Sequence, residues 1–451
     1  MKIRVILTLL IIFSIDLFSQ VKGGEQKKFT LDDCIKTALK KNFDIQLTDV
    51  KKEAANAGLT TAYGAYLPQI GVSMGYQRYL NVEQEKLPGG YDTLSSITPY
   101  ISGTDPNSYS MNATANLIVF DGFNREANYY SAKEYINSVD MSSRQTVKNV
   151  IISIYRQYVD VIKNMQIAKV RRDNLALGNK ELESIQAQYN AGVIPLSNVY
   201  SQEADLANRE LDLVLTENDI NHAKANILTT IGYNPDMNLE FEVSSLPDNI
   251  DVNEINNFAM SIGSLDNMIS KALNNRFDYS ASKSSIESAK YRVTANESGY
   301  YPKIYASGGW NWANSKFEDF NTRGRSFVAM NLSIPIFDNF TTNNQIQNAK
   351  LQLQQSEVES SKLEQSIRAQ VQAAYLNLQA AEKGIAITDK ALKAAQINYE
   401  STSERFKAGA SNITELQVSN NQLINIQVNR IRAVYSYILA QKEVQYAMGE
   451  L

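Results

Sequence analysis

The stretch LDDCIKTALKKNFD, residues 31–44, recurs as LDNMISKALNNRFD, residues 265–278. The same register continues without a gap to Pro68 in the first copy and to Pro302 in the second. Self-similarity of this kind indicates that one structural unit is encoded more than once. The chain is therefore predicted to be a tandem duplication in which most elements have a counterpart in the other copy.

A second register begins after a loop whose length differs between the copies. It pairs FDGF, residues 120–123, with FDNF, residues 337–340, and continues without a slip to Gly232 and Gly449. A match held over this length is difficult to obtain by chance. A short stretch at residues 233–264 lies between the copies and has no counterpart.

Each copy contains two stretches in which apolar residues alternate with small or polar ones, the period typical of strands with one apolar face. The apolar positions are Ile70, Val72, Met74 and Tyr76; Met111, Ala113, Ala115, Leu117 and Val119; Ile304, Ala306, Gly308, Trp310 and Trp312; and Val328, Met330, Leu332 and Ile334. Such strands belong either to a soluble sheet or to a transmembrane barrel with a lipid-facing apolar side. The rest of the chain is predicted to be helical and offers no layer to cover a soluble sheet, so we favour the barrel. Aromatic residues lie toward one end of the strands, where an interfacial girdle is expected: Tyr76, Tyr79, Trp310 and Trp312.

Four strands are too few to close a barrel, and open strand edges are not tolerated in lipid. The chain is therefore expected to oligomerise. Counting alone permits two copies with about eight strands or three copies with about twelve.

Two long helical stretches follow the strands, because no proline interrupts residues 124–191 or residues 341–408. At about 1.5 Å per residue each stretch reaches about 100 Å. A heptad-like apolar seam favours coiled-coil packing, and the other helix faces are polar. Long helices with a narrow seam suit a hollow tube of paired helices. The seam residues are Val147, Ile151, Ile154, Tyr158, Val161, Met165 and Ala168 in the first copy, and Ile424, Val428, Ile431, Tyr435 and Ile438 in the second.

The helices of each hairpin are joined at a turn that we call tip 1, YNAGVIPLS at residues 189–197, and tip 2, FKAGASNIT at residues 406–414. A glycine just past a helix supplies a left-handed C-cap. Ser197 and Thr414 are predicted to be the N-caps of the returning helices.

The N-terminus has the pattern of a secretory signal. Lys2 and Arg4 precede an apolar run at residues 5–15 that is too short to span a bilayer. We expect cleavage after Ser19, with Gly23 as the alternative, and a retained membrane anchor as the other interpretation. The mature chain is then exported, and no later segment suggests a transmembrane helix.

Composition argues against several functions. The net charge is −4 and the charges are spread along the chain, so no nucleic-acid partner is indicated. The single cysteine, Cys34, and the single histidine, His222, exclude a disulfide framework and argue against a Ser-His-Asp triad. They correspond to Met268 and Leu439 in the other copy, so we predict core or interface residues. No catalytic residue, metal site or cofactor is predicted.

These observations divide the chain into three parts. The predicted parts are a signal peptide at 1–19; a first repeat at 20–264, with strands at about 68–79 and 109–120, a helical hairpin at 124–232 and a segment without counterpart at 233–264, which the resemblance described below implies to be equatorial; and a second repeat at 265–451, with strands at about 302–313 and 326–337 and a helical hairpin at 341–449.

The duplication, the proline-led strands and the two aromatic-x-x-Gly tips resemble the TolC-type outer membrane efflux protein family over nearly the whole mature chain. The resemblance implies an α+β fold of tandem helix-strand-strand-helix units. It also implies a homotrimer, with a twelve-stranded barrel in outer-membrane lipid and a periplasmic helical barrel. Family members are passive exit ducts, coupled through a periplasmic adaptor to an inner-membrane pump. A tripartite efflux system and a type I secretion system both remain open, as does the exported substrate.

The resemblance also implies functional residues at the tips. Those expected to contact the adaptor are Gly192, Val193, Ser197, Gly409, Ala410 and Thr414. Glu415 falls at a position where family members have a ring of acids that narrows the pore. The alternative is that Glu415 is only a first-turn acid stabilised by the helix dipole. The family's namesake locks its tips with a tyrosine, an arginine and a second acid, but this chain has Phe406, Ser411 and Val418 there, so a gate needs other contacts.

Two other classes of protein compete with the channel. An enzyme lacks support, because the carboxylate pairs have no accompanying nucleophile, metal cluster or phosphate-binding loop. A structural or adhesive coiled-coil protein of the envelope, anchored by a small barrel, needs no partner at its tips. Polar lumen faces on the strands favour the channel over this alternative.

Overall fold

The computed structural model describes residues 28–451 except 79, 81–106, 318–319 and 321–323. The predicted signal peptide and Tyr79 lie outside the described residues. The chain forms two compact units: unit 1 is Met1–Thr48, Arg144–Arg276 and Ser366–Leu451, and unit 2 is Asp49–Ser143 and Phe277–Gln365. Each unit takes segments from both repeats, so the compact units do not follow the boundary between the repeats.

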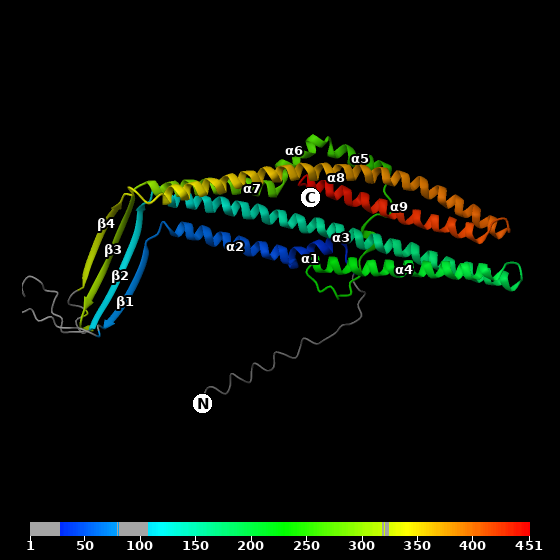
Figure 1. Cartoon of the computed structure of the whole chain (residues 1–451), viewed down its shortest axis with the longest axis horizontal. Coiled ribbons are helices and arrows are strands. Elements are labelled where there is room, and N and C mark those ends of the chain that lie inside the picture. Colours follow the sequence, from blue (N-terminus) through cyan, green and yellow to red (C-terminus); the bar gives the residue numbers. More distant parts are fainter. Residues whose placement is uncertain (1–27, 79, 81–106, 318–319, 321–323) are drawn as a thin grey trace, which may run out of the picture. The chain divides into compact units, whose positions relative to one another are not determined.

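Unit 2 contains an antiparallel sheet of four strands in the order β1-β2-β3-β4 (Figure 1). The strands are β1 Gln69–Arg78, β2 Asn107–Phe120, β3 Lys303–Asn314 and β4 Arg325–Ser333. The first repeat supplies β1 and β2, and the second supplies β3 and β4. The pairing of β2 with β3 joins the repeats, and β1 and β4 are the edges of this described sheet.

The strand register aligns the alternating apolar residues on one face. Ile70 pairs with Ala115, Ala115 with Gly308, and Gly308 with Val328, so one apolar row crosses all four strands. At the ends of this row Ile70 is 75% exposed and Val328 is 93% exposed. The predicted period of two is confirmed, and its apolar residues are exposed on the edge strands β1 and β4 of the single chain.

Two details of the strands differ from expectation. β4 ends at Ser333 instead of near residue 337, because Pro335 has no N–H for the strand ladder and interrupts the pattern. Trp312 is only 2% exposed, since Phe317 and Phe320 cover it. Trp312 is therefore a packed residue, whereas Tyr76 stays exposed and its ring lies tilted against that of Tyr109.

The transition from strand to long helix has the same local structure in both repeats. Gly122 and Phe123 have φ of 71° and 70°, and Asn339 and Phe340 have φ of 55° and 63°. The preceding aspartate then accepts a hydrogen bond from a first-turn amide: Arg125 N–H donates to Asp121 at 3.2 Å, and Thr342 N–H to Asp338 at 2.8 Å. This left-handed turn and cap begin the helices α3 Asn124–Asn190 and α8 Thr341–Lys407.

The remaining helices also occur in matched pairs. α3 and α8 both have 67 residues, α4 Leu196–Thr230 and α9 Ile413–Ala447 both have 35, and α1 Leu31–Lys41 and α6 Leu265–Asn275 both have 11. α2 Phe43–Gly64 corresponds to α7 Phe277–Glu297, which is followed by the 3-10 turn η2 Ser298–Tyr300. These equal lengths are what a tandem duplication predicts. Across the described ranges, no helix combines the length and apolar character that crossing a membrane requires.

The stretch between the repeats forms η1 Val243–Ser245 and α5 Val252–Ile262, and it packs in unit 1. Phe241 makes a parallel bridge with Phe29, and its ring contacts Tyr158 of α3 at 6.0 Å. The burial of α3 differs from the predicted narrow seam. α3 buries the seam residues Ile154, Tyr158 and Val161 but also their neighbours Ile152, Val159 and Ile162. The expectation of a narrow seam is therefore wrong for this part of α3, which buries a second strip beside the seam.

Candidate functional site at the hairpin tips

Tip 1 closes α3 with a glycine in the left-handed conformation. Gly192 has φ of 75°, and its N–H donates to the carbonyl of Tyr189 at 2.9 Å. The Val193 N–H donates to the carbonyl of Gln188 at 3.0 Å. These two bonds satisfy carbonyl groups at the helix end that have no intrahelical partner.

Tip 2 repeats this geometry at the end of α8. Gly409 has φ of 75°, its N–H donates to Phe406 O at 3.0 Å, and Ala410 N–H donates to Arg405 O at 2.8 Å. The predicted glycine C-caps are thus present in both hairpins.

The predicted N-caps are wrong at both tips. α4 begins at Leu196 after Pro195, which makes no side-chain cap, and Ser197 lies inside the helix. Proline suits this position because its fixed φ is compatible with a helix start. At tip 2, Asn412 caps α9 by accepting from the Glu415 N–H at 2.9 Å, and Thr414 lies inside the helix. Asparagine is at least as good a cap as threonine, so the earlier residue is used.

A small apolar core holds the two tips together within unit 1. Ile185 of α3, Val199 of α4 and Ile413 of α9 form its buried part. Partly buried side chains pack against it: Leu182, Ile194 and Phe406. Phe406 therefore contributes apolar surface, which explains how this position functions without the hydroxyl of a tyrosine.

The expected adaptor-contacting residues are all exposed in the chain. They are Gly192, Val193, Ser197, Gly409, Ala410 and Thr414. The Val193 side chain is 71% exposed. A Cβ added at Gly192 or Gly409 would meet no atom within 4 Å. Both tips thus present open surface, with room for another protein to approach their backbone closely.

Glu415 is also exposed, and it is the centre of the polar contacts at tip 2. Ser411 Oγ donates a short hydrogen bond to Glu415 Oε2, and Asn412 Nδ2 lies 3.4 Å from Glu415 Oε1. Arg405 Nη2 lies 3.6 Å from Glu415 Oε2. An exposed pair of this kind contributes at most about 1 kcal/mol. Sequence reasoning missed Arg405 because it lies on the other helix of the hairpin and meets Glu415 only once the turn has formed.

The single cysteine and histidine have different environments. Cys34 is fully buried, as predicted for a core position, and burial raises the pKa of its thiol to about 12. His222 is exposed, so it is not a core residue of the single chain; an interface position stays a prediction. Among the residues that the structure describes, no cluster of three or more histidine, cysteine, aspartate or glutamate side chains is arranged to hold a metal ion.

Comparison with known families identifies the class of this fold. The model of the outer membrane efflux protein family matches residues 34–233 and residues 268–450. The two matched segments lie one in each repeat. The chain belongs to the outer membrane efflux protein family, which is a family of channel proteins.

Individual relatives are similar along most of their length. The outer membrane efflux protein BepC of Brucella suis biovar 1 is 22% identical over 427 residues, covering 94% of this chain and 86% of BepC. The outer membrane protein TolC of Vibrio cholerae serotype O1 is 22% identical over 422 residues, covering 91% and 89%. Among solved structures, CusC has a TM-score of 0.79 at 15% identity, covering 93% of this chain and 92% of CusC. VceC of Vibrio cholerae has a TM-score of 0.75 at 16% identity, covering 93% and 96%. The structural matches show a shared fold.

Proposed function

We propose that this chain is the outer-membrane exit duct of a tripartite efflux or type I secretion system. It is a passive channel that a periplasmic adaptor couples to an inner-membrane pump. The observation that carries the proposal is that both hairpins of a chain in this family end in exposed glycine turns of the same geometry. An adaptor has to dock on surfaces of this kind, and transport energy has to come from the pump.

The sheet supports the proposed assembly. β1 and β4 leave edges, and the apolar row from Ile70 to Val328 is uncovered. Lipid accommodates the apolar row but not the unpaired edges, so β1 of one copy pairs with β4 of the next. Three copies then close a twelve-stranded barrel in the outer membrane, and the helical hairpins form a periplasmic tube. Residues 233–264 form an equatorial segment around this tube.

The proposal assigns roles to the tip residues. Gly192, Val193 and Ser197 of tip 1, with Gly409, Ala410 and Thr414 of tip 2, contact the adaptor; three copies of Glu415 line the constriction of the pore. In this arrangement the pore end carries three carboxylates, each next to an Arg405 guanidinium. The constriction therefore favours cations, but less strongly than a ring of unpaired acids.

Photo-crosslinking in cells tests the exit-duct role. A photoreactive amino acid replaces Val193 in one strain and Ala410 in another, because both side chains are exposed and lie at the tips. The matched control carries the probe at Val358, which is equally open to solvent on α8 outside the tips. We expect an adaptor to be captured from both tip positions but not from Val358, and the captured adaptor identifies the pump.

Two other results would contradict parts of the proposal. Capture of only other copies of the chain from the tip positions, in abundant and folded protein, favours a structural or adhesive envelope protein. A detergent-solubilised mass that does not correspond to three chains, measured by native mass spectrometry, contradicts the trimer.

A further inference from the structure

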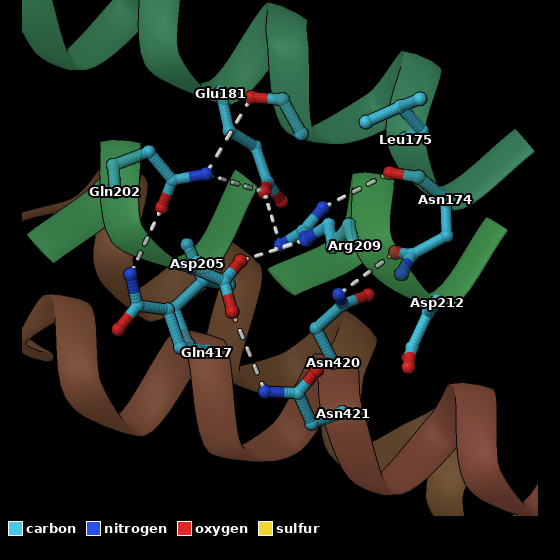
Figure 2. A network of polar contacts seen from close by, with 12 residues as sticks. Asn174, Leu175, Glu181, Gln202, Asp205, Arg209, Asp212, Gln417, Asn420 and Asn421 are labelled. Atoms are coloured by element: carbon cyan, nitrogen blue, oxygen red, sulfur yellow. Dashed lines mark hydrogen bonds and ion pairs between the residues drawn. The ribbon is translucent and has the colours of Figure 1, made fainter. Parts of the chain in front are cut away.

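Unit 1 contains a buried ion-pair network built on Arg209 of α4 (Figure 2). The Arg209 side chain is 3% exposed. Its guanidinium contacts two carboxylates, Glu181 of α3 at 2.9 Å and Asp205 of α4 at 2.7 Å. It also donates to the carbonyl of Asn174 at 3.1 Å. A buried guanidinium requires such partners, because an unpaired charge in the interior is very costly.

The network continues from the first hairpin into the second (Figure 2). Gln202 lies 3.3 Å from Glu181, and its side-chain oxygen accepts from Gln417 of α9 at 3.0 Å. Asn420 of α9 donates to the side chain of Asn174 at 3.0 Å. The Tyr399 hydroxyl of α8 donates to Glu181 at 3.4 Å. One polar centre thus connects all four hairpin helices.

The duplicated chain carries these charges only once. In the register that aligns Gly192 with Gly409, the counterparts of Arg209, Glu181 and Asp205 are Ile426, Asn398 and Gln422. The network is therefore not a feature that each hairpin has by itself. The ion pairs themselves lie within the first hairpin, between α3 and α4, and the second hairpin reaches them through the Tyr399 hydroxyl on Glu181 and the Asn421 amide, 3.5 Å from Asp205.

Apolar packing alone defines the position of two such hairpins poorly. Both have apolar residues at heptad-like spacing, and a slip by one helical turn or one heptad, about 5 or 10 Å, keeps apolar side chains in contact. A buried polar centre favours one alignment, since any other alignment takes Tyr399 and Asn421 away from Glu181 and Asp205, and takes Gln417 and Asn420 away from Gln202 and Asn174. A buried ion pair is a weak source of stability, so its contribution here is to specificity.

We infer that the Arg209–Glu181–Asp205 centre is a positioning site that aligns the second hairpin with the first at one register and thereby sets the relation of tip 1 to tip 2. The alignment of the second hairpin with the first follows from contacts within unit 1. Its consequence rests on the proposed function: in a tube of alternating hairpins, each first hairpin meets a second hairpin on both sides. The network fixes the alignment with the second hairpin of the same chain, and it keeps both tips in the position that an adaptor contacts.

The test separates positioning from stability. In the triple variant Arg209→Met, Glu181→Leu and Asp205→Leu, apolar side chains replace the charged centre together with its bonds to Tyr399 and Asn421, and replacing a buried ion pair in this way is often neutral or stabilising in other proteins. Spin labels at positions 193 and 410, in a Cys34→Ala background, report the distance between the tips by pulsed electron resonance. Labelled chains are diluted with unlabelled ones, so that distances within one chain dominate.

We expect the unaltered network to give one narrow distance distribution. The triple variant is expected to keep its helix content and unfolding midpoint but to add a population displaced by about 5–10 Å, a turn or a heptad. The matched control, Arg172→Met with Glu217→Leu, removes an exposed α3–α4 ion pair of 3.0 Å and should leave the distribution unchanged. A single narrow distribution in a folded triple variant would overturn the inference.

A second variant decides the matter if the triple variant does not fold. Arg209→Lys keeps the charge, but an ammonium group cannot reproduce the planar fork that contacts two carboxylates and a carbonyl together. We expect a folded protein in which the distribution of tip-to-tip distances is broader by about twofold or more, because a lysine restricts the alignment less than an arginine does. An unchanged distribution in this variant would also overturn the inference. The distance measurement uses purified protein without an adaptor, so failure of adaptor capture at the tips leaves its result standing.

Discussion

Arg405 and Glu415 face each other across tip 2, with Nη2 of the arginine 3.6 Å from Oε2 of the glutamate. The two residues are the last-turn base of α8 and the first-turn acid of α9, so each also has the sign that its helix end favours. Because both are exposed, salt screens their attraction, and the pair contributes little to folding. In the proposed duct, the pair sets the charge that each tip presents to the pore.

Changing either member of this pair should therefore alter ion selectivity in opposite directions. Glu415→Gln is expected to lower the permeability ratio of potassium to chloride, and Arg405→Gln to raise it. A charge at about 4 Å in water is worth about 1 kcal/mol, so a change of about fivefold is expected at low salt. Reversal potentials in planar bilayers measure both ratios. Equal ratios in the two variants at low ionic strength would show that Glu415 does not line the constriction.

The apolar core between the tips should be sensitive to truncation. Ile413→Ala removes buried methyl groups from contact with Ile185 and Val199, and such a cavity costs about 2–5 kcal/mol. Val418→Ala is the control on the same helix, since Val418 is 61% exposed and its loss should cost less than about 0.5 kcal/mol. Thermal unfolding followed by circular dichroism compares the two. Equal midpoints would mean that the core does not hold the hairpins.

Structural features that are determined by residues close together in the sequence could be predicted from it. The alternation around Ile70 and Val328 reflects two environments on the faces of one strand, so it is visible without the fold. Gly192 and Gly409 end their helices because a left-handed residue closes a helix at little steric cost. The repeat helped further, because every such signal could be checked in a second copy.

Contacts between distant elements could not be predicted in this way. Arg209 and Glu181 lie on different helices of a hairpin, and Gln417 comes from the other repeat, so no local pattern connects them. The same reason explains the narrow-seam error on α3, since no local pattern showed that Ile152, Val159 and Ile162 are buried as well. The N-cap at tip 2 was misplaced for a smaller reason, because Asn412 precedes Thr414 and its side chain accepts from the Glu415 amide.

Gly232 and Gly192 both have a positive φ, but an added Cβ would overlap another atom only at Gly232. Gly232 has φ of 80°, and a Cβ there would overlap the Lys41 carbonyl, lying 2.8 Å from its carbon. Gly192 has φ of 75° but open space around it. We expect Gly192→Ala to cost about 1–2 kcal/mol from the left-handed conformation. Gly232→Ala should cost clearly more, because a backbone carbonyl cannot move aside as a side chain can. Denaturant unfolding measures the difference, and equal costs would show that the Lys41 contact is relaxed in solution.

Tyr158 should make stability fall at alkaline pH. Burial raises the pKa of its phenol from 10.0 to about 12, so between these values the unfolded chain has lost the proton and the folded chain keeps it. The stabilisation is thus fully present below pH 10.0 and is lost as the pH rises through about 12.

The variant Tyr158→Phe removes this titration and should flatten the decline in unfolding free energy above pH 10.0. At neutral pH it should cost about 1–3 kcal/mol, because the hydroxyl donates to the Glu242 carbonyl at 2.8 Å and the carbonyl would keep only the Ser245 N–H at 3.3 Å. The exposed Tyr200→Phe is the control and should follow the parent protein at every pH, since its side chain meets solvent in both states. Urea unfolding between pH 7 and pH 12 measures all three proteins. An unchanged alkaline slope in Tyr158→Phe would assign the decline to other buried phenols of unit 1, of which Tyr435 and Tyr437 have their pKa raised to about 12 by burial in the same way.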